Sequence, residues 1–303
     1  MKNRLFTFLL LFSVNVCQLV HAERIALVAA YQGELDAILE FIPNEQIEEI
    51  RIINGVTFTL ATAYGKPVVI FKTNVSTVNA AMTTQLALSS FDIDALLFSG
   101  VAGGINPTLE KGDVVIPKHW VYHAESAYLN ETSPGSGEYI KPVHSISRLQ
   151  DGNFGMHHPR VVSAAKSGLT APVRMRSFDA DEVLLAVVQN TVERLQSDDA
   201  QAIQNASGDV ATIKLGGTGV AGPVFMDNAE YRDFVFKTWQ ADSLDMESTA
   251  VAHVAWSNDV PFVIIRSLSD LAGGQQGENE FSEYAKRAEK NSAFLMSEVL
   301  KAL

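Results

Sequence analysis

The feature that most constrains this chain is a repeated alternation of short apolar runs with segments of helical spacing. The apolar runs are typical of strands buried on both faces of a sheet. This order predicts an α/β fold, a three-layer αβα sandwich around a mixed, largely parallel twisted sheet. The predicted strands are 24–31, 66–75, 93–105, 112–117, 212–225 and 261–269, and the predicted helices are 34–42, 77–90, 181–196, 228–238, 248–257 and 281–302. No repeat or linker divides the chain, so we expect one domain over 23–303.

The first residues form a separate unit that is typical of a secretory signal peptide. A basic start, "MKNR", precedes the short apolar run "LFTFLLLFSV", and small residues follow at Val20 and Ala22. The apolar run is too short to span a membrane. We therefore expect cleavage after Ala22, export to the periplasm or the medium, and no attachment to the membrane afterwards. Cys17 would leave with the signal, so the exported protein would have no internal disulfide.

The charge of the chain argues against one class of partner. The sequence has 23 basic and 35 acidic residues, a net charge of −12. Loss of Lys2 and Arg4 with the signal would make this −14. Because such a surface repels phosphate backbones, we do not expect a nucleic-acid partner.

Three glycine-containing stretches are candidates for ligand contact. "GTGVAG" (217–222) has the spacing of a dinucleotide fingerprint, but it lies late in the chain and is not followed by a helix, so we interpret it as close strand packing. "SGVAGGINP" (99–107) leaves a predicted strand. Its glycines would either let backbone N–H groups approach a ligand or form a tight turn with positive φ. "AAYQGEL" (29–35) also follows a predicted strand.

Acidic residues cluster at the ends of predicted strands. Asp245 and Glu247 bracket Met246 just before a helix, and Asp270 ends the next strand. Ligands of open α/β sheets bind at the carboxyl ends of strands, so these acids and Glu34 are expected to line one crevice. The alternative is that Asp245 or Glu247 caps the following helix, and that Asp270 and Glu34 are ordinary acids at element ends.

Three motifs together resemble one family. "AAYQGEL", "SGVAGG…GDVVIP" and "LDMESTAVAHV…VPFVIIRSLSD" are similar to the methylthioadenosine/S-adenosylhomocysteine nucleosidases of the nucleoside phosphorylase superfamily. The resemblance runs from residue 24 to about 300. It implies a nucleoside phosphorylase-like fold, a homodimer, a purine nucleoside as small-molecule substrate, and no cofactor.

The resemblance also implies roles for individual residues. Asp270, paired with Ser269, would protonate the departing purine. Glu247 would hold the ribose hydroxyls and stabilise the ribosyl cation, while Met246 would pack against the sugar. Glu34 would orient or deprotonate the attacking water. The other implied contacts with the substrate are Val101, Ala102, Gly103, Val224, Phe225 and Asp245.

The chain departs from the family pattern at several positions. Glu34 is the only acid left in the first motif, Val101 stands at a usual serine position, and Asp245 replaces a glutamate. Two other functions are compatible with these motifs. One is a purine nucleoside phosphorylase, which uses phosphate, and the other is a nucleoside-binding or storage protein without turnover.

The nucleophile is expected to be water, because the stretches in which bacterial phosphorylases carry phosphate-binding arginines have none here. Phe98 lies near one of those positions, and "AAYQGELDA" has no basic residue. The remaining cationic candidates are Lys72, interpreted as a strand lysine paired with an acid, and Arg266, interpreted as structural.

The segment 123–176 is an insertion rich in Gly, Pro, Ser and His with little periodicity. We expect it to lie over or beside the 5′ side of the sugar or to form part of a dimer interface, and a plain surface excursion is the alternative. The histidines in or next to it are predicted to be solvent-exposed loop residues rather than metal ligands: His119, His123, His157 and His158.

Overall fold

The computed structural model describes residues 23–303 with the exception of 145, 151, 198–202 and 276. The predicted signal peptide 1–22 and its Cys17 therefore lie outside the described residues. Among the helices of the described part, none combines the length and the apolar character needed to cross a membrane.

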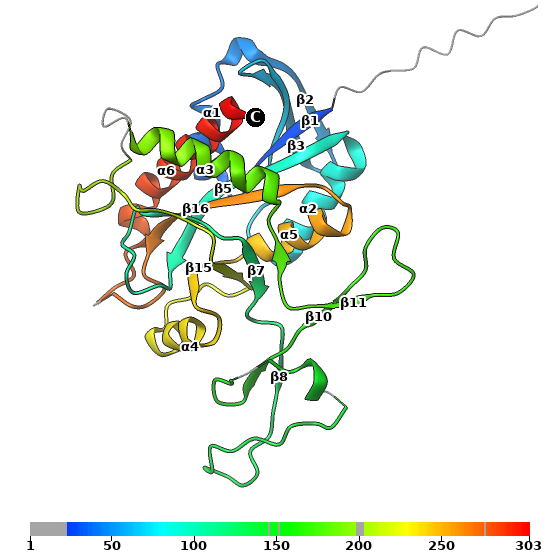
Figure 1. Ribbon diagram of the computed structural model, residues 1–303, viewed down its shortest axis with the longest axis vertical. Helices are drawn as coiled ribbons and strands as arrows, with labels where there is room; N and C mark the ends of the chain where they lie inside the picture. The colour runs from blue at the N-terminus through cyan, green and yellow to red at the C-terminus, as the bar shows by residue number, and fades with distance from the viewer. Residues whose placement is uncertain (1–22, 145, 151, 198–202, 276) are drawn as a thin grey trace, which may run out of the picture.

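The strands form one large mixed sheet (Figure 1). Its main path runs β12-β7-β14-β15-β5-β1-β4-β3-β2, and β16 pairs with β5 and with β6, which also pairs with β13. The pairs of β1 with β4 and β5, and of β5 with β16, are parallel, whereas β2, β3 and β4 are antiparallel. The strands are β1 (Arg24–Ala29), β2 (Ile47–Ile53), β3 (Val56–Ala63), β4 (Lys66–Lys72), β5 (Ile93–Gly104), β6 (Val114–Ile116), β7 (His119–Tyr122), β12 (Phe178–Asp179), β13 (Ile213–Leu215), β14 (Thr218–Ala221), β15 (Ala241–Asp245) and β16 (Phe262–Asp270).

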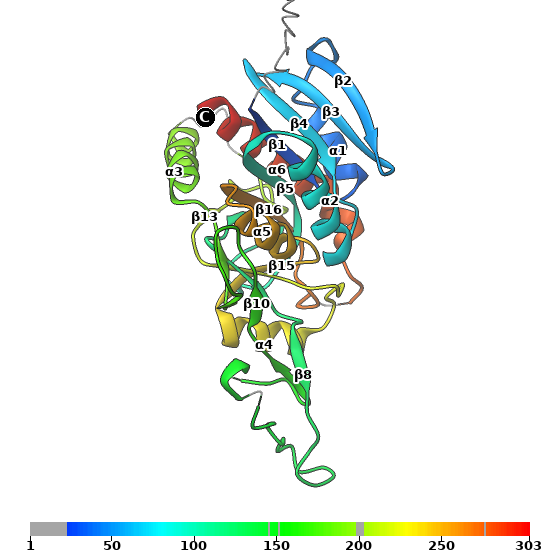
Figure 2. The same cartoon turned by 90° about the vertical axis from the view of Figure 1, so that its right-hand side faces the viewer.

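Helices cover both faces of this sheet. Figures 1 and 2 show α1, α3 and α6 on one face, while α2 and α5 pack together on the other. This arrangement confirms the predicted αβα sandwich. The helices are α1 (Gln32–Leu39), α2 (Thr77–Ser90), α3 (Glu182–Gln196), α4 (Ala229–Trp239), α5 (Ser248–Ser257) and α6 (Phe281–Ala302), with a short 3₁₀ turn η1 (Asn44–Gln46) after α1.

The predicted strand at 212–225 is wrong in its extent, because two strands occupy it. β13 and β14 are separated by Gly216 and Gly217, which both have positive φ. Positive φ interrupts a strand and is favourable for glycine. Gly219 in β14 fits the predicted close packing, because a Cβ there would lie 2.4 Å from the Trp120 ring.

The insertion projects away from the sheet as an arm of short hairpins (Figure 1). Strands of three residues pair within it, which explains why the sequence showed little periodicity. Its elements are β8 (Ser126–Tyr128), η2 (Ile146–Arg148), β9 (His157–Pro159), β10 (Val162–Ala164) and β11 (Val173–Met175).

The prediction that the histidines are solvent-exposed is wrong for His123 and His158, which are buried. His123 Nδ1 lies 2.9 Å from the Tyr231 hydroxyl on α4, and His158 Nε2 lies 2.9 Å from the Gln150 carbonyl oxygen. Burial lowers the pKa of His123 to about 3, so its ring is neutral near pH 7. In the described part of the chain, no group of three or more His, Cys, Asp or Glu side chains is placed to hold a metal ion.

Candidate active site

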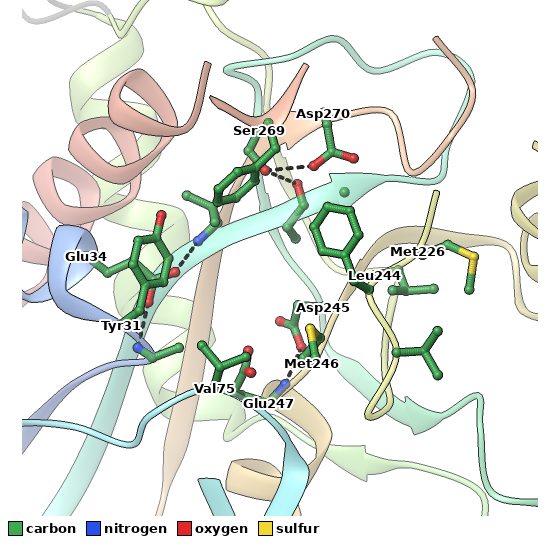
Figure 3. A pocket seen from close by; sticks show the side chains of 17 residues that line it. Tyr31, Glu34, Val75, Met226, Leu244, Asp245, Met246, Glu247, Ser269 and Asp270 are labelled. Atoms are coloured by element: carbon green, nitrogen blue, oxygen red, sulfur yellow. Dashed lines mark hydrogen bonds between the residues drawn. The ribbon is translucent and has the colours of Figure 1, made fainter. Parts of the chain in front are cut away.

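A cavity of about 400 Å³ opens at the carboxyl ends of β1, β5 and β16 (Figure 3). Every site residue predicted from the sequence lines it. Its lining consists of Ala30, Tyr31, Glu34, Val75, Val101, Ala102, Gly103, Val224, Phe225, Met226, Leu244, Asp245, Met246, Glu247, Ser269, Asp270 and Phe281. The expectation that 123–176 lies over the sugar is not met within one chain, because no described residue of that segment lines the cavity.

Glu34 lies in the first turn of α1, where two backbone donors hold its carboxylate. Oε2 accepts a hydrogen bond from the Ala30 N–H at 2.6 Å, and Oε1 accepts one from the Val101 N–H at 2.8 Å. Burial raises the pKa of Glu34, while Arg266 and these backbone donors oppose that rise. Glu34 is therefore a fixed, buried carboxyl group on the cavity wall, not an ordinary acid of a first helical turn.

Asp245 ends β15 and is fully engaged by protein donors. Its Oδ1 accepts hydrogen bonds from the N–H groups of Glu247 (3.0 Å) and Ser248 (2.9 Å). Its Oδ2 accepts from Arg266 Nε at 2.7 Å and from the Ser248 hydroxyl. The capping alternative therefore holds for Asp245, which also neutralises a buried arginine.

Glu247 occupies the N-cap position of α5 but makes no side-chain capping hydrogen bond, so the capping alternative is wrong for this residue. Its Oε1 instead accepts a hydrogen bond from the Ser76 N–H across the cavity at 2.5 Å. Ser76 has φ 88° and ψ 151°, a conformation that normally requires glycine. The strained backbone at Ser76 is thus part of the structure that holds Glu247 in place.

Burial and the neighbouring Asp245 raise the pKa of Glu247 to about 8. In the unfolded chain a glutamate ionises near 4.5, so folding loses stability as the pH rises from about 4.5 to about 8. We predict that Glu247→Gln increases the free energy of unfolding by about 1–3 kcal/mol at pH 8 and by much less at pH 5. Urea unfolding at both pH values measures this, with the exposed Glu45→Gln as control. A gain equal at both pH values would contradict the assignment.

Asp270 ends β16 beside Ser269, as Figure 3 shows. Its Oδ1 accepts a hydrogen bond from the Ala272 N–H at 2.7 Å, and its Oδ2 lies 3.0 Å from the Ser269 hydroxyl. Burial raises the pKa of Asp270, which favours the protonated acid. A buried carboxyl group with a raised pKa is suited to donate a proton.

The glycine stretch 99–104 is not a turn, because it forms the end of β5. Gly100 serves the protein interior instead of a ligand: a Cβ there would lie 1.9 Å from Arg266 Nη1 and 2.3 Å from Glu34 Oε1. Gly103, in contrast, lines the cavity. The glycine at position 100 therefore gives Arg266 and Glu34 the space to approach each other.

The two cationic candidates do not reach the cavity. Arg266 is fully buried, with its guanidinium over the Phe98 ring at 3.9 Å and Nη1 at 4.0 Å from Glu34 Oε1. Lys72 donates to Gln32 Oε1 at 3.0 Å, so the predicted pairing with an acid is wrong. Among the described residues that line the cavity, none is a lysine or an arginine.

Sequence reasoning missed the apolar part of the lining. The hydrophobic pattern marked Val75, Met226, Leu244 and Phe281 only as candidates for packing, and they come from four separate segments. Tyr31 was within reach of prediction, because it lies in the same motif as Glu34.

Comparisons with known proteins agree with this geometry. A family model for the phosphorylase superfamily matches residues 24–301. A 5′-methylthioadenosine/S-adenosylhomocysteine nucleosidase of Geobacillus kaustophilus is 31% identical, over 84% of this chain and 88% of its own length. The enzyme of the same name from a Marinomonas species is 28% identical, over 91% of this chain and 98% of its own length.

Two solved structures share the fold. The methylthioadenosine/S-adenosylhomocysteine nucleosidase of Neisseria meningitidis in complex with methylthio-immucillin-A has a TM-score of 0.67 and 22% identity, covering 93% of this chain and 100% of that chain. Futalosine hydrolase of Helicobacter pylori has a TM-score of 0.68 and 19% identity, covering 93% of this chain and 99% of that chain. Because proteins with two different names fit equally well, the fold does not select a substrate.

Proposed function

Because this chain belongs to the phosphorylase superfamily, and within it to the family of the methylthioadenosine/S-adenosylhomocysteine nucleosidases, we propose that it is a purine nucleosidase. Its substrate would be an adenine-type nucleoside, and its products the free base and a ribosyl compound. The observation that carries this proposal is the placement of Glu34, Glu247 and Asp270 around one cavity.

Each of these acids has a place in the hydrolysis of the N-glycosidic bond. As the bond breaks, its electron pair passes to the purine, which takes a proton from Asp270. The ribosyl group becomes cationic, and the carboxyl group of Glu247 binds its hydroxyls and opposes the positive charge. Glu34 orients a water molecule, whose oxygen bonds to the anomeric carbon as its proton passes to the carboxylate. Val224 and Phe225 would pack against the base, and Met246 against the sugar.

The charge of the cavity favours water over phosphate as the nucleophile. A phosphate needs cationic groups or several N–H donors, and arginine is the usual choice. The acids in the lining would repel it, and Arg266 is directed to Asp245 and away from the cavity. This argument places the phosphorylase second.

Incubation with a panel of purine nucleosides, followed by chromatography of the products, tests the proposed function. We expect release of free adenine from a 5′-modified adenosine. Tight binding without release of base would establish the binding-protein alternative. Retention of all three acids in the cavity argues against that outcome.

We also propose that the chain is exported and processed after Ala22. The support is the basic start, the apolar run and the small residues at Val20 and Ala22. N-terminal sequencing of protein from the periplasm or the medium should begin at Glu23. Recovery of an intact chain from Met1 in the cytoplasm alone would contradict export.

We further propose a homodimer in which the arm 123–176 contacts the second copy. The arm exposes large apolar side chains, among them Tyr128, Ile140 and Val143. It has six basic and four acidic residues in a chain of net charge −12, so it is attracted to the body of another copy. Light scattering should give the mass of a dimer, and Val143→Asp should shift the protein towards the monomer. A monomeric wild type would contradict this proposal.

A further inference from the structure

One wall of the cavity has no role in the proposed reaction. If Asp270 faces the base and Glu247 the ribose, the wall formed by Tyr31, Val75 and Phe281 is left for the substituent at the 5′ carbon. Figure 3 shows Tyr31 and Val75 on the side of the cavity away from Asp270. We call these three residues the 5′ wall.

The ring of Tyr31 is fixed in this wall from behind. Its hydroxyl donates a hydrogen bond to Glu289 Oε1 on α6 at 2.5 Å, and its ring centroid lies 6.4 Å from that of Phe281, the first residue of α6. Both Tyr31 and Glu289 are half-buried. A hydrogen bond to a carboxylate and a ring contact to the same helix leave the tyrosine little freedom to move aside for a ligand.

Gly33 gives the carboxylate of Glu289 room to reach the wall. A Cβ at position 33 would lie 2.3 Å from Glu289 Oε1 and 2.8 Å from its carboxyl carbon. Any side chain at position 33 would therefore displace Glu289 from Tyr31. The glycine, the tyrosine and the glutamate form one local structure that holds a negative charge directly behind the 5′ wall.

No cation of the lining offsets this charge. The cavity-lining residues described by the structure include acids but no lysine or arginine, and Glu34 follows Tyr31 by one helical turn. Lys290, which follows Glu289 in α6, pairs with Glu40 at 3.3 Å instead. A carboxylate on the ligand would therefore meet like charge in a partly dehydrated setting, where charges act more strongly than in bulk water.

We propose that Tyr31 and Glu289 determine substrate specificity by admitting uncharged, apolar 5′ substituents and rejecting those that carry a carboxylate. Tyr31 would touch the substituent, whereas Glu289 would act as a positioning residue and through its charge. This inference rests on the proposed function, because that function assigns the wall to the 5′ substituent.

The test compares two ligands of equal length that differ in charge, 5′-butylthioadenosine and 5′-(3-carboxypropylthio)adenosine. We expect the wild type to favour the butylthio compound by about tenfold or more, in Kd by calorimetry and in kcat/KM. Glu289→Gln keeps an acceptor for the Tyr31 hydroxyl but removes the charge, so it should reduce this preference by about fivefold. Glu283→Gln, an exposed acid on the same helix, is the matched control and should leave the preference unchanged.

Equal affinity of the wild type for the two ligands would overturn the inference. So would an unchanged preference in Glu289→Gln, or an equal loss of preference in Glu283→Gln. The calorimetric ratio needs no turnover, so it decides this inference even if neither compound is hydrolysed. That last outcome would count against the proposed function alone.

Discussion

Replacing Asp270 by asparagine is expected to lower kcat by about 10²–10⁴-fold while leaving the Kd of the nucleoside within a few-fold of the wild type. Asparagine keeps the shape of the side chain and an oxygen that can accept from the Ala272 N–H, which lies 2.7 Å from Oδ1 in the wild type. It has no acidic proton to give to the departing base. Single-turnover kinetics measure the chemical step, and calorimetry measures binding.

The pH profile gives this prediction a second readout. Since burial raises the pKa of Asp270, the acid is protonated over a wider range than an exposed aspartate, and kcat should fall as the pH rises through that raised value. Asp270→Asn should lack this fall. Asp94→Asn, an exposed acid at the other end of the same sheet, is the control. If Asp270→Asn retained near-normal turnover, the residue would not be the proton donor.

The second large effect is expected for Glu34→Gln, with a loss in kcat of about 10²–10⁴-fold. The glutamine amide cannot accept the proton of the attacking water. It also replaces one of the two acceptor oxygens that bind the N–H groups of Ala30 and Val101, so a buried donor loses its partner. That second effect should lower the free energy of unfolding by about 1–3 kcal/mol.

Thermal unfolding and single-turnover kinetics together separate the two consequences of Glu34→Gln. The surface substitution Asp36→Asn, in the same helix, should change neither quantity. A variant that is less stable but hydrolyses at the normal rate would show that Glu34 is structural only. In that case the water would have to be activated by another group of the cavity.

The location of the site followed from the sequence because it depends on local patterns. Acids at the ends of Val/Ile-rich strands mark the carboxyl edge of a sheet, and Asp245, Glu247 and Asp270 all lie there. The span of α2 also agrees with the prediction at both ends. These features depend on period and on element order, which a sequence displays directly.

The parts that escaped prediction depend on contacts between distant segments. Tyr31 and Glu289 are separated by 258 positions, and nothing in either segment indicates their hydrogen bond. Gly100 has the same appearance as a turn glycine, but its function is to make room for Arg266. β2 was missed because its charged residues and exposed isoleucines do not show a buried face.

The most direct test of the account is to follow the nucleophile during turnover of a 5′-alkylthioadenosine in water enriched in ¹⁸O, with and without added phosphate. The account predicts the same rate in both buffers, free adenine, and one ¹⁸O atom on the anomeric carbon of the released sugar. A rate that vanishes without phosphate, with a ribose 1-phosphate as product, would contradict hydrolysis and establish phosphorolysis.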